Sequence, residues 1–160
     1  SPGRDSAKTA QLMEDLRTKG VYEVSDDMRQ FMADFVGGFA EEAEVFKTIR
    51  DLKEETGYVL DPHTAVASAV YKQYAEKSGD TRKTVIASTA SPYKFAPNVM
   101  KALGNDVENQ DVFDVIDQLS AISGVPEPRA IREVRNAEIR HSEVCEISEM
   151  KKMVEDFLFA

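Results

Sequence analysis

Apolar residues recur at helical spacing along most of the chain, and polar residues suited to helix ends separate these stretches. Candidate N-caps are Asp5 or Ser6 for the first helix, then Ser25 and Asp61, and candidate C-terminal glycines are Gly57 and Gly79. The pattern therefore predicts a mostly helical chain. The predicted helices cover about residues 5–19, 26–36, 40–56, 62–78, 92–103, 111–122, 129–134 and 148–157.

Two short apolar runs have the composition of strands. Residues 58–60 are Tyr-Val-Leu, and residues 84–86 are the β-branched Thr-Val-Ile. Residues 21–24 form a third short extended piece. Because a helix follows each of the first two runs, residues 58–103 have the strand–helix–strand–helix order of a parallel α/β unit. The predicted fold class is α/β, with two or three short parallel strands in a mostly helical chain.

Composition excludes several classes of function. The 20 basic and 29 acidic residues leave a net charge of -9, without the basic stripe that nucleic-acid binding needs. No apolar run approaches the roughly 20 residues of a membrane span. A single cysteine excludes an internal disulfide and is typical of a reducing compartment. We therefore expect a cytoplasmic protein with no nucleic-acid or membrane partner.

Metal and nucleotide motifs are missing from the sequence. His141 and Cys145 are four residues apart, which would place both on one helix face, but two ligands without another cysteine do not make a structural zinc site. No phosphate-binding loop or Gly-x-Gly-x-x-Gly motif occurs. We therefore expect no metal site.

Two turns remain as candidate ligand sites. Asp61 follows the first apolar run, and Ser88, Thr89 and Ser91 follow the second. Ligands of parallel sheets bind beyond the carboxyl ends of strands, beside helix N-termini, so we expect both turns at one sheet edge. Taken singly, Asp61 and Ser91 can equally be simple helix caps.

These turns resemble motifs in the C-terminal portion of threonine synthase, a pyridoxal-phosphate-dependent enzyme of fold type II, the tryptophan synthase β-like group. The motifs are Asp-Pro-His-Thr-Ala-Val at residues 61–66 and Ser-Thr-Ala-Ser-Pro-Tyr-Lys-Phe at residues 88–95. Further similar segments are residues 3–24, 119–134 and 139–146.

The resemblance implies part of a three-layer sheet. Residues 58–104 would belong to the cofactor-binding domain, residues 1–57 would form a helical segment, and residues 105–160 would form a C-terminal helical arm.

The resemblance also assigns roles to the turn residues. In the family, the threonine of the Ser-Thr-Ala motif hydrogen-bonds the ring nitrogen of the cofactor, a role that falls on Thr89. Ser88 and Asp61 are implied as flanking cofactor-binding residues. A neutral hydroxyl does not enforce ring protonation as a carboxylate would. Many family members carry histidine where this chain has Ser91, so no acid–base role is carried over to that position.

The resemblance implies a carbon–oxygen lyase of threonine biosynthesis, which converts O-phospho-L-homoserine and water to L-threonine and phosphate. The family's Schiff-base lysine motif, Ser-Phe-Lys-Asp, and its glycine- and asparagine-rich phosphate loop are not in these 160 residues. We therefore expect a C-terminal fragment with no catalytic residue, no activity and no stable pyridoxal phosphate binding of its own. The expected partners are the N-terminal part of the same polypeptide, the small-molecule substrate in the complete enzyme, and a second copy through exposed apolar edges.

Two alternatives stay open at this point. The chain could be a catalytically inactive helical module, derived from the same fold, that binds a protein partner. It could instead belong to another fold type II lyase that resembles threonine dehydratase.

Overall fold

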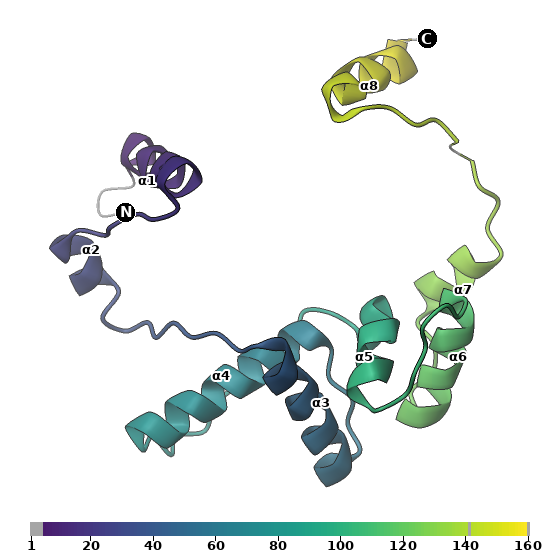
Figure 1. Cartoon of the computed structure of the whole chain (residues 1–160), viewed down its shortest axis with the longest axis horizontal. Coiled ribbons are helices and arrows are strands. Elements are labelled where there is room, and N and C mark those ends of the chain that lie inside the picture. The colour runs from purple at the N-terminus through teal and green to yellow at the C-terminus, as the bar shows by residue number, and fades with distance from the viewer. Residues whose placement is uncertain (1–4, 141, 160) are drawn as a thin grey trace.

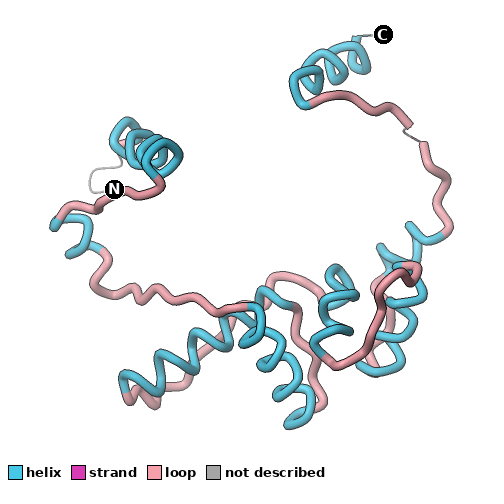
Figure 2. Tube along the Cα trace, viewed as in Figure 1, coloured by secondary structure: helices cyan, strands magenta, loops and turns pink. Residues whose placement is uncertain are grey.

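Helices joined by loops make up the described chain, residues 5–140 and 142–159 of the computed structural model (Figure 2). The helices form an arch, with α3 to α6 at its base and with α1 and α8 at its two raised ends (Figure 1). The α-helices are α1 (Ser6–Lys19), α2 (Asp26–Phe31), α3 (Glu42–Thr56), α4 (Pro62–Ser78), α5 (Ala96–Ala102), α6 (Val112–Ser123), α7 (Arg129–Arg135) and α8 (Met150–Phe159). Two 3-10 helices, η2 (Pro92–Phe95) and η3 (Ile147–Glu149), precede α5 and α8.

A hydrophobic core joins the helices at the base of the arch. Helix α3 packs against α4 and α5, and α5 packs against α6. Ile49, Met100 and Leu119 are fully buried and come from α3, α5 and α6. Because burying a large aliphatic side chain stabilises by roughly 1.5–3 kcal/mol, these contacts are the main source of stability.

Two polar clusters tie the chain after α6 to this core. The Tyr93 hydroxyl, buried in η2, donates a hydrogen bond to the main-chain carbonyl of Val125. Arg135 of α7 donates to both carboxylate oxygens of Asp117 in α6, at 2.9 and 2.6 Å, and to Glu127 at 3.0 Å. The guanidinium group holds the pKa of the Asp117 carboxyl below its usual value.

Most helix predictions are confirmed. The predicted caps Asp5, Ser25 and Asp61 each accept a hydrogen bond from a main-chain N–H at a helix start. Gly57 ends α3 with φ of 80°, a left-handed conformation that costs glycine little. Two boundaries differ: α2 ends at Phe31 rather than near residue 36, and the helix predicted from residue 92 begins as the 3-10 helix η2.

The predicted parallel sheet is wrong, because the described residues contain no strand. Residues 21–24, 58–60 and 84–88 lie in loops, and the side chain of Val85 is 94% exposed. β-Branched composition forms a strand only where another strand supplies hydrogen bonds and packing, and no described segment does so. The α/β class and its partial three-layer sheet are therefore replaced by an all-helical arrangement. Val59 and Leu60 are nevertheless buried in the core, as apolar side chains of their size should be.

The two ends of the arch expose large apolar side chains. Helices α1 and α8 contain no buried residue, and α2 buries only Met28. Phe35, after α2, is 78% exposed, and Phe159, at the end of α8, is 83% exposed. Apolar surface of this kind is typical of regions that contact another polypeptide.

Replacement of Ile49 by alanine is expected to lower the free energy of unfolding by about 2–5 kcal/mol, because it leaves a cavity between packed helices. Val85→Ala is the matched control and should change it by less than about 0.5 kcal/mol, because that side chain is exposed. Urea unfolding of the chain, followed by far-UV circular dichroism, measures both. Equal losses for the two variants would contradict the assigned core.

The chain alone is expected to self-associate as its concentration rises, because the arms expose aromatic side chains. Size-exclusion chromatography with light scattering measures the mass. Phe35→Ser combined with Phe159→Ser should shift the chain toward monomer, whereas Thr81→Ser at another exposed position should not. A monodisperse monomer at high concentration would show that the exposed apolar surface does not drive association.

Candidate functional site

Asp61 lies at the start of α4 with only 1% of its surface exposed. Its Oδ1 atom accepts hydrogen bonds from the main-chain N–H groups of His63 (2.9 Å) and Thr64 (3.2 Å). Its Oδ2 atom accepts from the Thr64 hydroxyl. Buried carboxylates require such partners, and the positive end of the helix dipole adds favourable charge. Asp61 is therefore a buried helix cap, with both carboxylate oxygens engaged.

The Thr64 hydroxyl connects this cap to the second candidate turn. Thr64 is 6% exposed, and its Oγ1 atom lies 3.0 Å from Oγ of Ser88, which is 24 residues further along the chain. Asp61, Thr64 and Ser88 thus form one hydrogen-bonded series, called here the hydroxyl bridge. The structure brings the two candidate turns together through this bridge, without a sheet edge.

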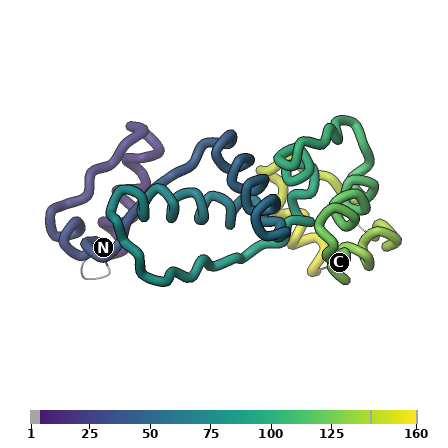
Figure 3. Tube along the Cα trace, turned by 90° about the horizontal axis from the view of Figure 1, so that it is seen from below, coloured from purple at the N-terminus to yellow at the C-terminus, as the bar shows by residue number. Residues whose placement is uncertain are grey.

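The loop between α4 and η2 runs back alongside α4 (Figure 3) and is tied to it at both ends. At its beginning, Asp80 accepts a hydrogen bond from the Tyr74 hydroxyl at 3.1 Å and forms an ion pair with Arg82 at 2.5 Å. Hydrogen bonds from the Arg82 side chain and main chain hold the pKa of Asp80 well below its usual value. At its end, the hydroxyl bridge fixes Ser88. The middle of the loop, around Val85, is exposed.

Thr89 follows directly after Ser88 and is exposed. Its hydroxyl makes no hydrogen bond with any described residue, so it is available to a ligand. Two residues later, the Ser91 side chain accepts a hydrogen bond from the Tyr93 N–H at 3.3 Å and caps η2. Ser91 therefore has the role of a helix cap, and Thr89 lies between two anchored serines.

The side chains of His63, Lys94 and Phe95 lie close to one another. The His63 ring lies 4.8 Å from the Phe95 ring, centroid to centroid, and its Nδ1 atom lies 3.6 Å from Oδ1 of Asp61. The Lys94 Nζ atom lies 5.4 Å from the centroid of the Phe95 ring. His63, Lys94 and Phe95 therefore form one contacting group that joins the start of α4 to η2.

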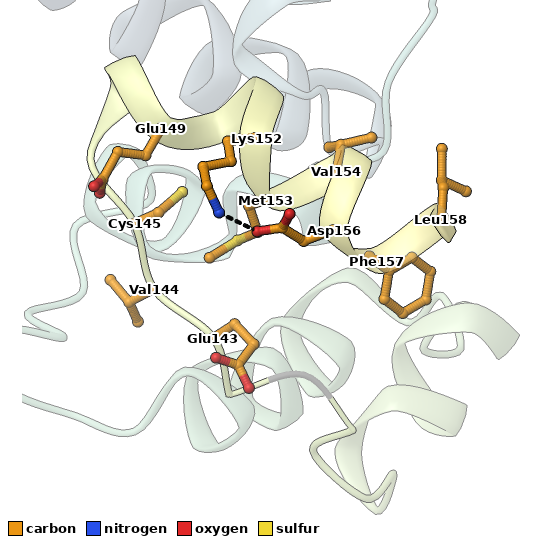
Figure 4. Close-up of a pocket in the computed structure, with 10 residues that line it drawn as sticks. All are labelled: Glu143, Val144, Cys145, Glu149, Lys152, Met153, Val154, Asp156, Phe157 and Leu158. Carbon is orange, nitrogen blue, oxygen red and sulfur yellow. Dashed lines mark hydrogen bonds and ion pairs between the residues drawn. The ribbon is translucent and has the colours of Figure 1, made fainter. Parts of the chain in front are cut away.

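A cavity of about 700 Å³ lies between α8 and the segment before it (Figure 4). Its lining is largely apolar and includes Val144, Met153 and Phe157, with an ion pair between Lys152 and Asp156 at 2.5 Å. None of the predicted site residues lines it. This cavity is therefore part of the apolar surface of the C-terminal arm.

The two metal-ligand types that are spaced four residues apart in the sequence belong to the segment before α8. His141 lies outside the described residues, and Cys145 is half-buried in the α8 cavity. Elsewhere in the described chain, no three histidine, cysteine or acidic residues are placed to hold a metal ion. None of the described helices is long and apolar enough to cross a membrane.

Much of the chain, from the first turn of α4 through the second candidate turn to α8, matches a known family. The family model described as "Threonine synthase, C-terminal" covers residues 64–154, which is more than half of the chain. The chain therefore belongs to the threonine synthase C-terminal family, and the resemblance noted in the sequence is confirmed.

Individual relatives agree with this assignment. Threonine synthase-like 1 of Mus musculus is 33% identical over 120 residues, which are 74% of this chain and 16% of that protein. Threonine synthase of Corynebacterium glutamicum is 26% identical over 129 residues, which are 78% of this chain and 26% of that protein. The chain thus spans about a quarter or less of the length of these relatives.

A solved structure has a similar fold over much of this chain. The crystal structure of a PLP-bound threonine synthase from Brucella melitensis matches with a TM-score of 0.53 and 30% sequence identity. The match covers 72% of this chain and 25% of that one.

Thr64 is the residue of this site that sequence reasoning missed. The motif of residues 61–66 contains Thr64, but the sequence pattern alone predicts no role for it. Its signal was the spacing: a threonine three residues after an Asp N-cap has its hydroxyl within reach of the capping carboxylate. The contact with Ser88 could not be read from spacing, because it joins residues far apart in the sequence.

Asp61→Ala is expected to destabilise the chain by about 2 kcal/mol or more, because it removes a helix cap and leaves buried donors without an acceptor. Asp111→Ala is the matched control: Asp111 caps α6 through one hydrogen bond to Phe113 and is exposed, so its loss should cost about 1 kcal/mol. Urea titration monitored by circular dichroism compares them. A smaller loss for Asp61→Ala than for Asp111→Ala would argue against a special role of the buried carboxylate.

Proposed function

We propose that this chain is the C-terminal part of a pyridoxal-phosphate-dependent threonine synthase. The complete enzyme would convert O-phospho-L-homoserine and water to L-threonine and phosphate. The observation that carries the proposal is the turn at Thr89: it has the family's Ser-Thr-Ala motif, an available hydroxyl, and a neighbour anchored by the hydroxyl bridge.

The residues of this turn fit the ring-nitrogen end of pyridoxal phosphate. The Thr89 hydroxyl is neutral, exposed and unpartnered within the described chain. The nearby Asp61 carboxylate is buried, and the start of α4 and Thr64 occupy its oxygens. The turn therefore offers a ring nitrogen a neutral donor and no free carboxylate.

Each residue of the turn has a separate task in this proposal. Thr89 would donate a hydrogen bond from Oγ1 to the ring nitrogen and so help to hold the ring in place. Ser88 flanks the ring, and Asp61 supports both from behind through Thr64. When bound, the cofactor supplies the electron sink for the reaction, and a neutral donor at its nitrogen moderates that property.

The remaining parts of the active site would come from elsewhere in a longer polypeptide. The sequence contains no Ser-Phe-Lys-Asp motif and no glycine-rich phosphate loop. The proposed partners of this chain are accordingly the N-terminal part of the same protein and, in the complete enzyme, the small-molecule substrate. The exposed apolar arms are suitable surfaces for contact with that larger part.

Release of phosphate from O-phospho-L-homoserine, measured with added pyridoxal phosphate, tests the proposal. The full-length polypeptide is expected to release phosphate and form L-threonine in equal amounts. The 160-residue chain alone is expected to show neither turnover nor a stoichiometric visible absorbance band of the bound cofactor, because the lysine motif is not in it.

Turnover by the 160-residue chain alone would contradict the proposal that this chain supplies only part of the active site. A full-length polypeptide that binds pyridoxal phosphate but leaves O-phospho-L-homoserine unchanged would instead contradict the proposed reaction.

A further inference from the structure

We infer that Thr64 is a positioning residue for the cofactor site: its buried hydroxyl holds Ser88, and through Ser88 it orders the adjoining Thr89. The inference rests on the proposed function, since it concerns the same turn. It adds a residue to the site that comes from α4 rather than from the turn itself.

The hydrogen bonds of the turn show why Thr64 matters. Among residues 85–90, the contact of Ser88 with Thr64 is the one hydrogen bond made to any described residue. The next anchor, Ser91, caps η2 and lies beyond Thr89. Without the Thr64 hydroxyl, Thr89 would keep an anchor on one side only. The residues before Thr89 would then be mobile in the cofactor-free protein. Cofactor binding would have to order them, and the conformational entropy lost would weaken binding.

The Thr64 hydroxyl is buried, and its hydrogen bonds go to the candidate turn as well as to its own helix. The main-chain N–H groups at the start of α4 are already satisfied by Oδ1 of Asp61. The Thr64 hydroxyl is therefore left to donate its one hydrogen to Oδ2 of Asp61 and to accept a hydrogen bond from the Ser88 hydroxyl, 3.0 Å away. A buried hydroxyl is costly unless it is hydrogen-bonded, and valine would have a similar shape without that cost. The polar residue at this position links the rigid helix to the turn.

The test uses the full-length polypeptide, the four single variants Thr64→Val, Thr64→Ser, Ser88→Ala and Thr89→Val, and one double variant that combines Thr64→Val with Ser88→Ala. Fluorescence titration of the cofactor-free protein with pyridoxal phosphate gives the dissociation constant. Hydrogen exchange, read by mass spectrometry on a peptide covering residues 85–91, reports the order of the turn. Thermal unfolding of the cofactor-free protein reports the global fold.

Thr64→Val is expected to raise the dissociation constant on the order of tenfold, the effect of one lost buried hydrogen bond. Thr64→Val should also speed hydrogen exchange of the main-chain amides in residues 85–91. Thr64→Ser keeps the hydroxyl and should stay near the wild-type values. If Thr64 acts through Ser88, Thr64→Val combined with Ser88→Ala should weaken binding no more than Ser88→Ala alone.

Three outcomes would overturn the inference, and they are distinguishable. If Thr89→Val weakens binding but Thr64→Val does not, Thr64 has no positioning role and the proposed function stands. If Thr89→Val has no effect, the proposed cofactor contact fails and the inference fails with it. If Thr64→Ser and Thr64→Val equally lower the unfolding temperature and speed exchange throughout the protein, Thr64 has only a general structural role.

Discussion

The buried carboxylate of Asp61 is the interaction on which this arrangement depends. One of its oxygens accepts hydrogen bonds from main-chain N–H groups at the start of α4, and the other accepts a hydrogen bond from the Thr64 hydroxyl. The Thr64 hydroxyl in turn lies within hydrogen-bonding distance of Ser88. Asp61 thus connects the helical core, which includes the neighbouring residues Leu60 and Ala65, to the exposed loop between α4 and η2. Burial strengthens these hydrogen bonds, and it also makes the loss of any one of them costly. A cofactor-binding turn held in this way would be ordered before its ligand arrives.

The helices could be predicted from the sequence because their causes are local. The cap at Asp61, the proline at position 62 and the glycine at position 79 all act within α4 or next to it, so they leave a readable pattern. The prediction of strands was wrong because a strand depends on contacts with distant parts of the chain. Val85 and its neighbours have strand composition, but a strand exists only with a partner, and the described chain provides none. The apolar composition of that loop is therefore not enough to predict its structure.

The candidate site could be predicted in part. The motif at residues 88–95 predicts Thr89 as the cofactor contact, which stays a prediction; the structure shows that the Thr89 hydroxyl has no hydrogen-bond partner among the described residues, while Ser91 caps η2. Asp61 was expected to flank the cofactor, and the structure places it behind the turn with its oxygens occupied. Thr64 received no role because the contact that defines it crosses 24 residues of chain. Such contacts depend on how α4 and the returning loop pack together.

The crystal structure of the full-length polypeptide with pyridoxal phosphate bound tests the central claim most directly. The decisive measurement is the distance from Oγ1 of Thr89 to the ring nitrogen. The account predicts a hydrogen bond of about 2.7–3.0 Å, with the contacts among Asp61, Thr64 and Ser88 kept as they are in this chain. A ring nitrogen that contacts a carboxylate or another segment, with Thr89 out of hydrogen-bonding range, would contradict it.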